Sequence, residues 1–189
     1  MAWVNTSPLV KTYTLEEFWE LPEPPDHSKV ELIAGVLYMT PPPEKPHGRA
    51  VSRINRFLYE HLIKTGDKGT LYSPRTGVSV TPNTWLEPDL FYVSAETEAR
   101  SASRYHTTAD LVVEVISPGS AIYDRNTKAD TYGALGVKEL WLVDELSGSI
   151  EIRILKDERY ESHVFERDDQ LRSTILPELE FRVGDVFSD

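Results

Sequence analysis

Residues 110–120 read DLVVEVISPGS, and the whole interpretation of the chain starts from this stretch. Its apolar run LVVEVI is nearly continuous, which is typical of a central strand covered on both faces. The segment Ser117-Pro-Gly-Ser120 breaks the strand, and residues 124–135 then have a helical pattern that stops at Gly136. A further strand is predicted at residues 139–144, ELWLVD.

The remaining elements are predicted from the same kinds of signal. Thr14 and Glu17 have the spacing of a capping box, which predicts a short helix ending near Glu20. Apolar residues recur at helical spacing over residues 48–64. Strands are predicted at residues 30–39 (two, turned at Gly35), 71–81, 88–93, 149–155 and 160–166, the last two forming a hairpin around residues 156–159, whereas PPPEKP at 41–46 predicts a loop.

Length and composition favour one globular domain spanning residues 1–189, because 40% of the residues are hydrophobic and no repeat or linker interrupts the chain. The absence of cysteine excludes disulfides, thiolate zinc sites and cysteine nucleophiles. Neither a secretory signal pattern nor a run of eighteen apolar residues is present, so we expect a soluble, cytoplasmic protein with no membrane partner.

The net charge of −11 argues against a nucleic-acid partner when it is taken alone. Its distribution changes that expectation, because residues 45–75 contain seven Lys or Arg against two acids, a net +5. Within the predicted helix, Arg49, Arg53 and Arg56 form a stripe opposite the apolar face. The stripe is either an ordinary solvated helix face or a surface for phosphates.

Glu114 is the one charged residue within the apolar strand, and its burial requires a compensating partner. Either that partner is a bound cation, or Glu114 belongs to a buried ion pair with another side chain or to an edge strand. Asp89, in Glu87-Pro-Asp89 at the start of the preceding strand, would lie beside Glu114 if the two strands are neighbours. Mg²⁺ prefers hard oxygen ligands and usually takes one or two carboxylates, which these two acids would supply.

A lysine near such a site would stabilise charge that develops on a phosphate. The position two residues after Glu114, on the same strand face, is Ile116. The nearest downstream lysine is Lys128, in the second turn of the predicted helix, with Tyr132 on the same helix face. Lys128 is therefore either an active-site residue that reaches back to the sheet or a solvated helix lysine.

Two histidines lie in or beside the predicted helix at residues 48–64. His47 stands directly before the predicted helix at residues 48–64 and is interpreted as a hydrogen-bonding residue of the helix start, although it could approach the site. His61 lies on the apolar face and is interpreted as a core histidine.

Nearly end to end, the chain resembles the Uma-two group of restriction endonucleases, in the PD-(D/E)XK nuclease superfamily. The combination of PD, VEVISP, the downstream DRxxK and GVxELWLVD is far more specific than any one of these motifs. The matching segments are YTLEEF at 13–18, VELIAG at 30–35, HGRAVSRINRFL at 47–58, EPDLFYV at 87–93, DLVVEVISPGS at 110–120, DRNTKADTYGALGVKELWLVD at 124–144 and the closing hairpin.

This resemblance implies a restriction-endonuclease-like α/β core, with a mixed central sheet flanked by helices and additional antiparallel strands. It implies Mg²⁺ or Mn²⁺ on Asp89, Glu114 and the main-chain carbonyl of Val115. Lys128 is then the migrated replacement for the lysine expected at Ile116. Glu31 corresponds to an extra acid that orients or activates water, or else is a surface acid at the start of a strand.

The predicted function is metal-dependent hydrolysis of phosphodiester bonds in nucleic acid, with DNA as the expected substrate and a homodimer as the expected assembly. In this reading Asp89 and Glu114 hold the ion that activates a water, and Lys128 stabilises the developing charge. Two alternatives stay open: a nuclease fold without catalysis that serves as a binding or regulatory module, and a structural protein whose strand acids form interior ion pairs.

Overall fold

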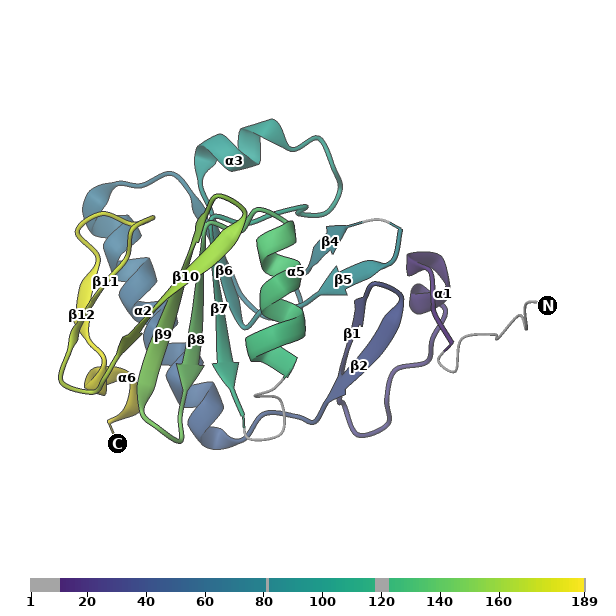
Figure 1. Ribbon diagram of the computed structural model, residues 1–189, viewed down its shortest axis with the longest axis horizontal. Helices are drawn as coiled ribbons and strands as arrows, with labels where there is room; N and C mark the ends of the chain where they lie inside the picture. The colour runs from purple at the N-terminus through teal and green to yellow at the C-terminus, as the bar shows by residue number, and fades with distance from the viewer. Residues whose placement is uncertain (1–10, 81, 118–122, 189) are drawn as a thin grey trace, which may run out of the picture.

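A computed structural model describes residues 11–80, 82–117 and 123–188 of the chain, and its centre is a six-stranded mixed sheet (Figure 1). The strand order is β10-β9-β8-β7-β6-β3, and every neighbouring pair is antiparallel except β7 and β8, which are parallel. These strands are β3 (Thr70–Tyr72), β6 (Leu90–Val93), β7 (Leu111–Ile116), β8 (Glu139–Asp144), β9 (Ser149–Lys156) and β10 (Arg159–Phe165).

Strand β7 lies inside this sheet, with β6 on one side and β8 on the other. All six of its residues are buried, as the apolar run predicts. The edge-strand alternative for Glu114 is therefore wrong.

Two smaller sheets accompany the central one. The first has the order β2-β1-β5-β4, and the second is the pair β11 and β12. Their strands are β1 (Lys29–Ile33), β2 (Val36–Thr40), β4 (Val78–Val80), β5 (Thr84–Leu86), β11 (Gln170–Arg172) and β12 (Glu180–Arg182).

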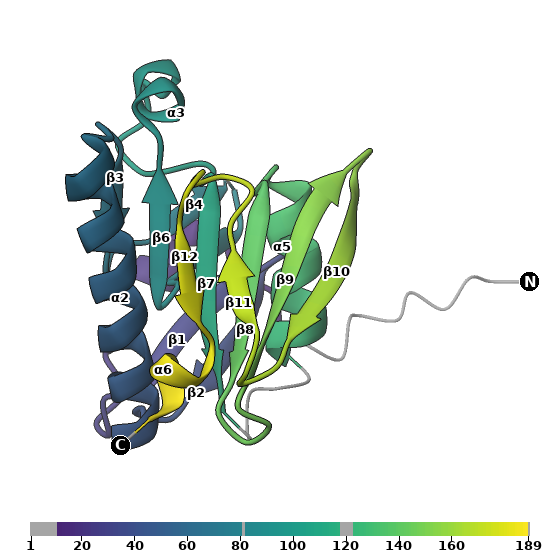
Figure 2. The same ribbon diagram turned by 90° about the vertical axis from the view of Figure 1, so that its left-hand side faces the viewer.

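The helices cover both faces of the central sheet, with α2 and α5 on opposite sides (Figure 2). A single π-helical turn, η1, leads directly into α5, where the sequence predicts one continuous helix. The helical elements are α1 (Leu15–Trp19), α2 (Lys45–Thr65), α3 (Ala95–Arg100), η1 (Asp124–Lys128), α5 (Ala129–Ala134) and α6 (Gly184–Phe187).

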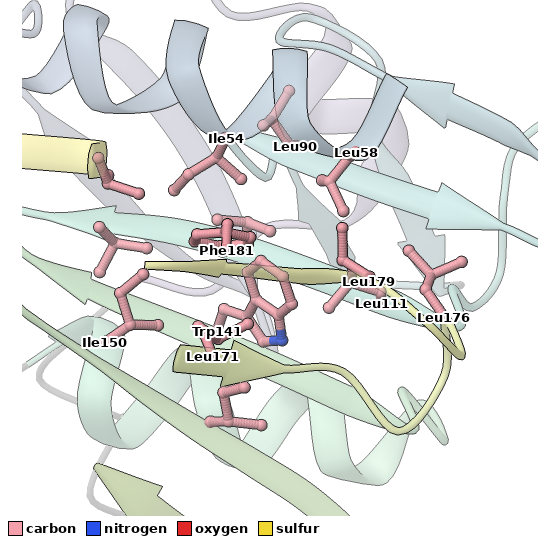
Figure 3. Packing of buried hydrophobic residues seen from close by; sticks show 14 of the residues in the cluster. Ile54, Leu58, Leu90, Leu111, Trp141, Ile150, Leu171, Leu176, Leu179 and Phe181 are labelled. Atoms are coloured by element: carbon pink, nitrogen blue, oxygen red, sulfur yellow. The ribbon is translucent and has the colours of Figure 1, made fainter. Parts of the chain in front are cut away.

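Alternate residues of β7 enter two separate apolar cores. Leu111, Val113 and Val115 face α2 and the β11–β12 pair, in the core drawn in Figure 3. Val112 and Ile116 belong to the other core, which includes Ala129 and Tyr132 from α5 and side chains from the small four-stranded sheet. Because side chains alternate along a strand, Glu114 lies on this second side.

Several local predictions are confirmed. The capping box of α1 is present, with the Thr14 hydroxyl accepting from Glu17 N–H and the Glu17 carboxylate accepting from Thr14 N–H. The first two strands turn at Gly35, which has a φ of 83°. Strand β8 has the predicted bounds, and β9 and β10 form the predicted hairpin.

Other boundaries were wrong for identifiable reasons. Helix α2 begins at Lys45, within the segment predicted as a loop, because a proline is tolerated in the first turn of a helix, where Pro46 lies. The single strand expected at residues 71–81 is two strands in different sheets, β3 and β4. Between them the chain turns through Arg75, whose φ is 76°. Strands β5, β11 and β12 and helices α3 and α6 were not predicted.

Candidate active site

The two acids predicted to bind metal converge where β6 begins and β7 ends. Leu90 pairs with Val113 across the antiparallel ladder, so Asp89 lies directly before β6 and beside the last residues of β7. The Asp89 carboxylate accepts the N–H of Val115 on its Oδ2 atom at 2.7 Å. A side chain thus continues the ladder where the strand has stopped, and this bond fixes Asp89 next to Glu114.

Lys128 reaches back to the sheet from η1 and is almost fully buried, with 1% of its side chain exposed. Its ammonium lies 2.5 Å from Glu114 Oε1, 3.1 Å from Glu31 Oε2 and 3.7 Å from Asp124 Oδ1. The solvated-lysine alternative is therefore wrong. The buried ion pair that was one alternative for Glu114 is present, and its partner in that pair is Lys128, the lysine predicted for the site.

Glu31 enters the same cluster from β1, in the small four-stranded sheet, and its side chain is completely buried. Its Oε1 atom accepts the N–H of Glu87 at 2.8 Å, and its Oε2 atom accepts from the hydroxyl of Tyr123 at 3.3 Å. The surface-acid alternative for Glu31 is wrong. The bond to Glu87 joins β1 to the segment that leads into Asp89.

Tyr132 completes the surroundings of Glu114, because its hydroxyl donates to Glu114 Oε1 at 2.6 Å. It lies four residues after Lys128, on the face of α5 that packs on the sheet, as the helical spacing predicts. Burial, together with the neighbouring Glu114 carboxylate, raises the pKa of the Tyr132 hydroxyl well above its usual value, so this hydroxyl stays a donor.

Two basic side chains of the cluster, His47 and Lys29, were missed or given a lesser role at the sequence level. His47, in the first turn of α2, has its Nε2 atom 3.2 Å from Asp89 Oδ2, so it approaches the site and is more than a residue of the helix start. Lys29, two residues before Glu31 and therefore on the same face of β1, has its ammonium 3.7 Å from Glu31 Oε2. That spacing was a signal that could have identified Lys29. His61 is buried, as expected of a core histidine.

Burial and charge act in opposite directions on the ionisable groups. Burial raises the pKa of Glu114 to about 7, although the charge of Lys128 opposes the rise. Burial alone would lower the pKa of Lys128, but the fields of Glu114, Glu31 and Asp124 together raise it well above the ordinary lysine value. Lys128 is therefore an ammonium at neutral pH, whereas Glu114 changes its charge there.

Asp89 behaves differently from Glu114. Burial works to raise its pKa, but the hydrogen bond from His47, the charge of Lys29 and the N–H of Val115 outweigh it and hold the pKa below its usual range. Asp89 is therefore a carboxylate throughout the neutral range.

The donor atoms fit a hard divalent cation. Asp89 Oδ2 accepts from Val115 and His47, and Glu114 Oε1 contacts Lys128 and Tyr132. Among the residues that the structure describes, no hydrogen bond is made to Asp89 Oδ1 or Glu114 Oε2. Each acid thus has one oxygen held by the protein and one left over.

Val115 could supply the third oxygen. The N–H and C=O of a strand residue point to the same neighbouring strand, so its carbonyl lies on the side of Asp89. The described residues contain no group of three or more His, Cys, Asp or Glu side chains that could hold a metal ion by themselves. Mg²⁺ does not require one, since it usually takes one or two carboxylates and keeps several waters.

The arginine stripe has a mixed environment. Arg56 is exposed and lies 3.9 Å from Glu60, one helical turn further along α2, and Arg49 is exposed as well. Arg53 is partly buried and donates to the main-chain carbonyls of Val186 and Ser188, so it also fastens the C-terminal segment to α2. A phosphate-binding role for the three arginines stays a prediction.

No helix in the described parts of the chain has the length and apolar character needed to cross a membrane.

Comparisons with known proteins agree with this architecture. The family model Uma2, described as "Putative restriction endonuclease", matches residues 15–184. The crystal structure of "a putative nuclease belonging to DUF820" from Anabaena variabilis is similar to this chain with a TM-score of 0.75 and 20% sequence identity, over 93% of this chain and 97% of that one. At that identity the likeness shows the fold alone. No curated protein matches the chain.

Proposed function

Because the chain belongs to the Uma2 family of restriction endonucleases, we propose that it is a divalent-metal-dependent endonuclease that hydrolyses phosphodiester bonds of DNA. Asp89, Glu114 and the carbonyl of Val115 are the proposed ligands of Mg²⁺ or Mn²⁺. The observation that supports this proposal most directly is the pair of unoccupied carboxylate oxygens, Asp89 Oδ1 and Glu114 Oε2, within the described residues.

The remaining side chains hold these ligands and balance their charge. Tyr132 and Lys128 both contact Glu114 Oε1, which leaves Oε2 as the atom available to a cation. Glu31 anchors the other side of the Lys128 ammonium and is tied to the main chain before Asp89. In this proposal Lys128 keeps a positive charge next to Glu114, and Glu31 fixes that charge and orients water.

A divalent ion bound to these oxygens would supply positive charge at the reacting phosphate and favour the ionisation of a nearby water. The protein's own part is to hold two carboxylates in place and to keep an ammonium beside them. Preorganised charge of this kind costs no rearrangement when negative charge develops on phosphorus.

The basic face of α2 is the proposed binding surface for the phosphates of DNA. His47, in the first turn of this helix, contacts Asp89, so the helix that bears the arginine stripe also touches the site. Replacing Arg49, Arg53 and Arg56 with Gln should weaken DNA binding and flatten its salt dependence, since each phosphate contact releases a counterion. Unchanged binding would reject that role. A homodimer, which would let two sites cut both strands, stays a prediction.

Nicking of supercoiled plasmid in Mg²⁺ or Mn²⁺ tests the proposal. The wild type should nick, and Asp89→Ala and Lys128→Ala should each lose most of the activity. Glu161→Gln, which changes an exposed acid on β10, is the matched control and should behave as wild type. Activity that survives both active-site substitutions would identify a contaminating nuclease, and a metal-loaded wild type that cuts nothing would reject the proposal.

A second function, DNA binding without cleavage, is favoured by one specific observation. Ile116 occupies the position expected for the catalytic lysine, and the ammonium of Lys128 is already surrounded by three carboxylates. A protein of this kind would bind a DNA duplex in a gel-shift assay and leave the plasmid intact. Thermal stabilisation by Mn²⁺ would then still report the metal site, by mass action.

A further inference from the structure

Two lysine ammonium groups share one oxygen of Glu31. Lys128 Nζ lies 3.1 Å from Glu31 Oε2, and Lys29 Nζ lies 3.7 Å from the same atom. The two lysines belong to different elements: Lys128 lies in the helical turn η1, and Lys29 is the first residue of strand β1. The cluster therefore contains two fixed positive charges close together, where the sequence motifs point to one.

The two ammonium groups differ in their access to solvent. The side chain of Lys128 is 1% exposed, whereas that of Lys29 is 28% exposed. A DNA backbone cannot enter the protein interior, so a group that touches a phosphate must lie at the surface of the site. By this criterion Lys29 can contact the substrate in the structure as it stands, and Lys128 cannot.

The two groups also differ in spare hydrogen-bonding capacity. An ammonium has three N–H donors. Those of Lys128 face three carboxylates, the closest at 2.5 Å. Lys29 makes a single hydrogen bond, to the carbonyl of Glu87 at 2.9 Å, and its nearest carboxylate oxygen is beyond hydrogen-bonding distance at 3.7 Å. Among the described residues, Lys29 is thus left with donors that no protein group uses.

Lys29 is also placed next to the proposed metal ligands. Its hydrogen-bond partner, Glu87, stands two residues before Asp89 in the segment that leads into β6. The charge of Lys29 lowers the pKa of both Asp89 and Glu114, so its field reaches both acids. A phosphate bound at the two free carboxylate oxygens through a metal ion would lie within the same field.

We propose that Lys29 is a catalytic residue whose ammonium contacts the phosphate of the bound DNA, and that Lys128 is a positioning residue that holds Glu114 and Glu31. This inference rests on the proposed nuclease function and deepens it by assigning the substrate contact to a lysine outside the family motifs. In this proposal Lys128 holds Glu114 and Glu31 in place, and Lys29 contacts the substrate.

The test compares Lys29→Met, Lys29→Arg and a matched control, Lys156→Met, in steady-state cleavage of a short DNA duplex with Mn²⁺. Lys156 is an exposed lysine paired with one acid on the β9–β10 hairpin, away from the cluster. Lys29→Met should lower kcat/KM by about 100-fold, the size found when one preorganised donor is removed. Lys29→Arg should recover a large part of the loss, and Lys156→Met should match the wild type.

Metal affinity separates a substrate contact from a structural role. The Mn²⁺ concentration that gives half of the maximal thermal stabilisation should not rise more than about twofold above wild type in Lys29→Met, because the proposed ligands stay in place and a positive charge that repels the metal ion is removed. A structural lysine would instead lose metal affinity, melting temperature and activity together. That joint loss, or a kcat/KM near wild type in Lys29→Met, would overturn the assignment.

Failure of the proposed function gives a different result. If the wild type cuts no DNA, the nuclease proposal fails, and the role of Lys29 is then judged from binding of the same duplex with Mn²⁺. Weaker binding by Lys29→Met with wild-type metal affinity would support the phosphate contact. Equal binding by the variant and the wild type, or no binding by either, would overturn it.

Discussion

Replacement of Lys128 with Met should destabilise the protein strongly, because it removes the cation from a buried cluster of acids. The ammonium lies within 3.7 Å of Glu114, Glu31 and Asp124, and its side chain is 1% exposed. Methionine fills a similar volume, so the loss is electrostatic more than a loss of packing. Removing one partner of a buried ion pair costs about 3–5 kcal/mol, and the buried acids here would lose their closest cation.

Urea unfolding at neutral pH measures this loss directly. Lys156→Met is the control, because its pair with Glu161 is exposed and should contribute less than about 1 kcal/mol. In the double variant Lys128→Met with Glu114→Gln, one of the stranded charges is gone, so at least about 1 kcal/mol should be recovered. If Lys128→Met unfolds within about 1 kcal/mol of the wild type, or if the second substitution recovers nothing, the buried charge cluster is not what stabilises this region.

Three other results are expected. Burial raises the pKa of Glu114 to about 7 from 4.5, so its stabilising contribution is complete below about pH 4.5 and is lost as the pH rises to about 7. In urea unfolding, Glu114→Gln should therefore gain stability relative to wild type between about pH 5 and pH 8, and a constant difference would contradict this. His47→Ala should weaken Mn²⁺ binding by about tenfold in titration calorimetry, since it frees Asp89, and His47→Gln should restore it because its amide can donate to the same oxygen; equal affinities would exclude this role. Replacing Arg49 and Arg56 with Gln should reduce the slope of log K against log salt for duplex binding by roughly 1.8, and an unchanged slope would exclude both as phosphate contacts.

Strand β7 and its neighbours were predictable because local signals agree there with the global fold. The run LVVEVI is typical of a strand covered on both faces, and all of its residues are buried. The strand at 139–144 has the expected bounds for the same reason. The split of residues 71–81 into β3 and β4 was not predictable, because Arg75 has a positive φ and no glycine at that position signals the turn.

Part of the candidate site was also predictable. Asp89 and Glu114 were paired on the assumption that their strands are neighbours, and β6 does pair with β7. The burial of Lys128 was one of two alternatives, since helical spacing gives the face of a residue but not the contacts of its side chain. His47 was assigned the simpler role because nothing in its own helix indicates that Asp89 lies 3.2 Å away.

The sequence by itself determined strands β7 and β8, the family, and Asp89 and Glu114 as the two acids of the site. These depend on periodicity and on pairs of residues in adjacent strands, which the chain encodes locally. Only the tertiary structure decided how far the other charged groups of the site lie from these two acids. Lys29, Glu31, His47 and Lys128 come from β1, α2 and η1, and packing of these elements against the sheet sets the distances between their charges. No local pattern contains those distances, because they depend on how separate elements share one interior.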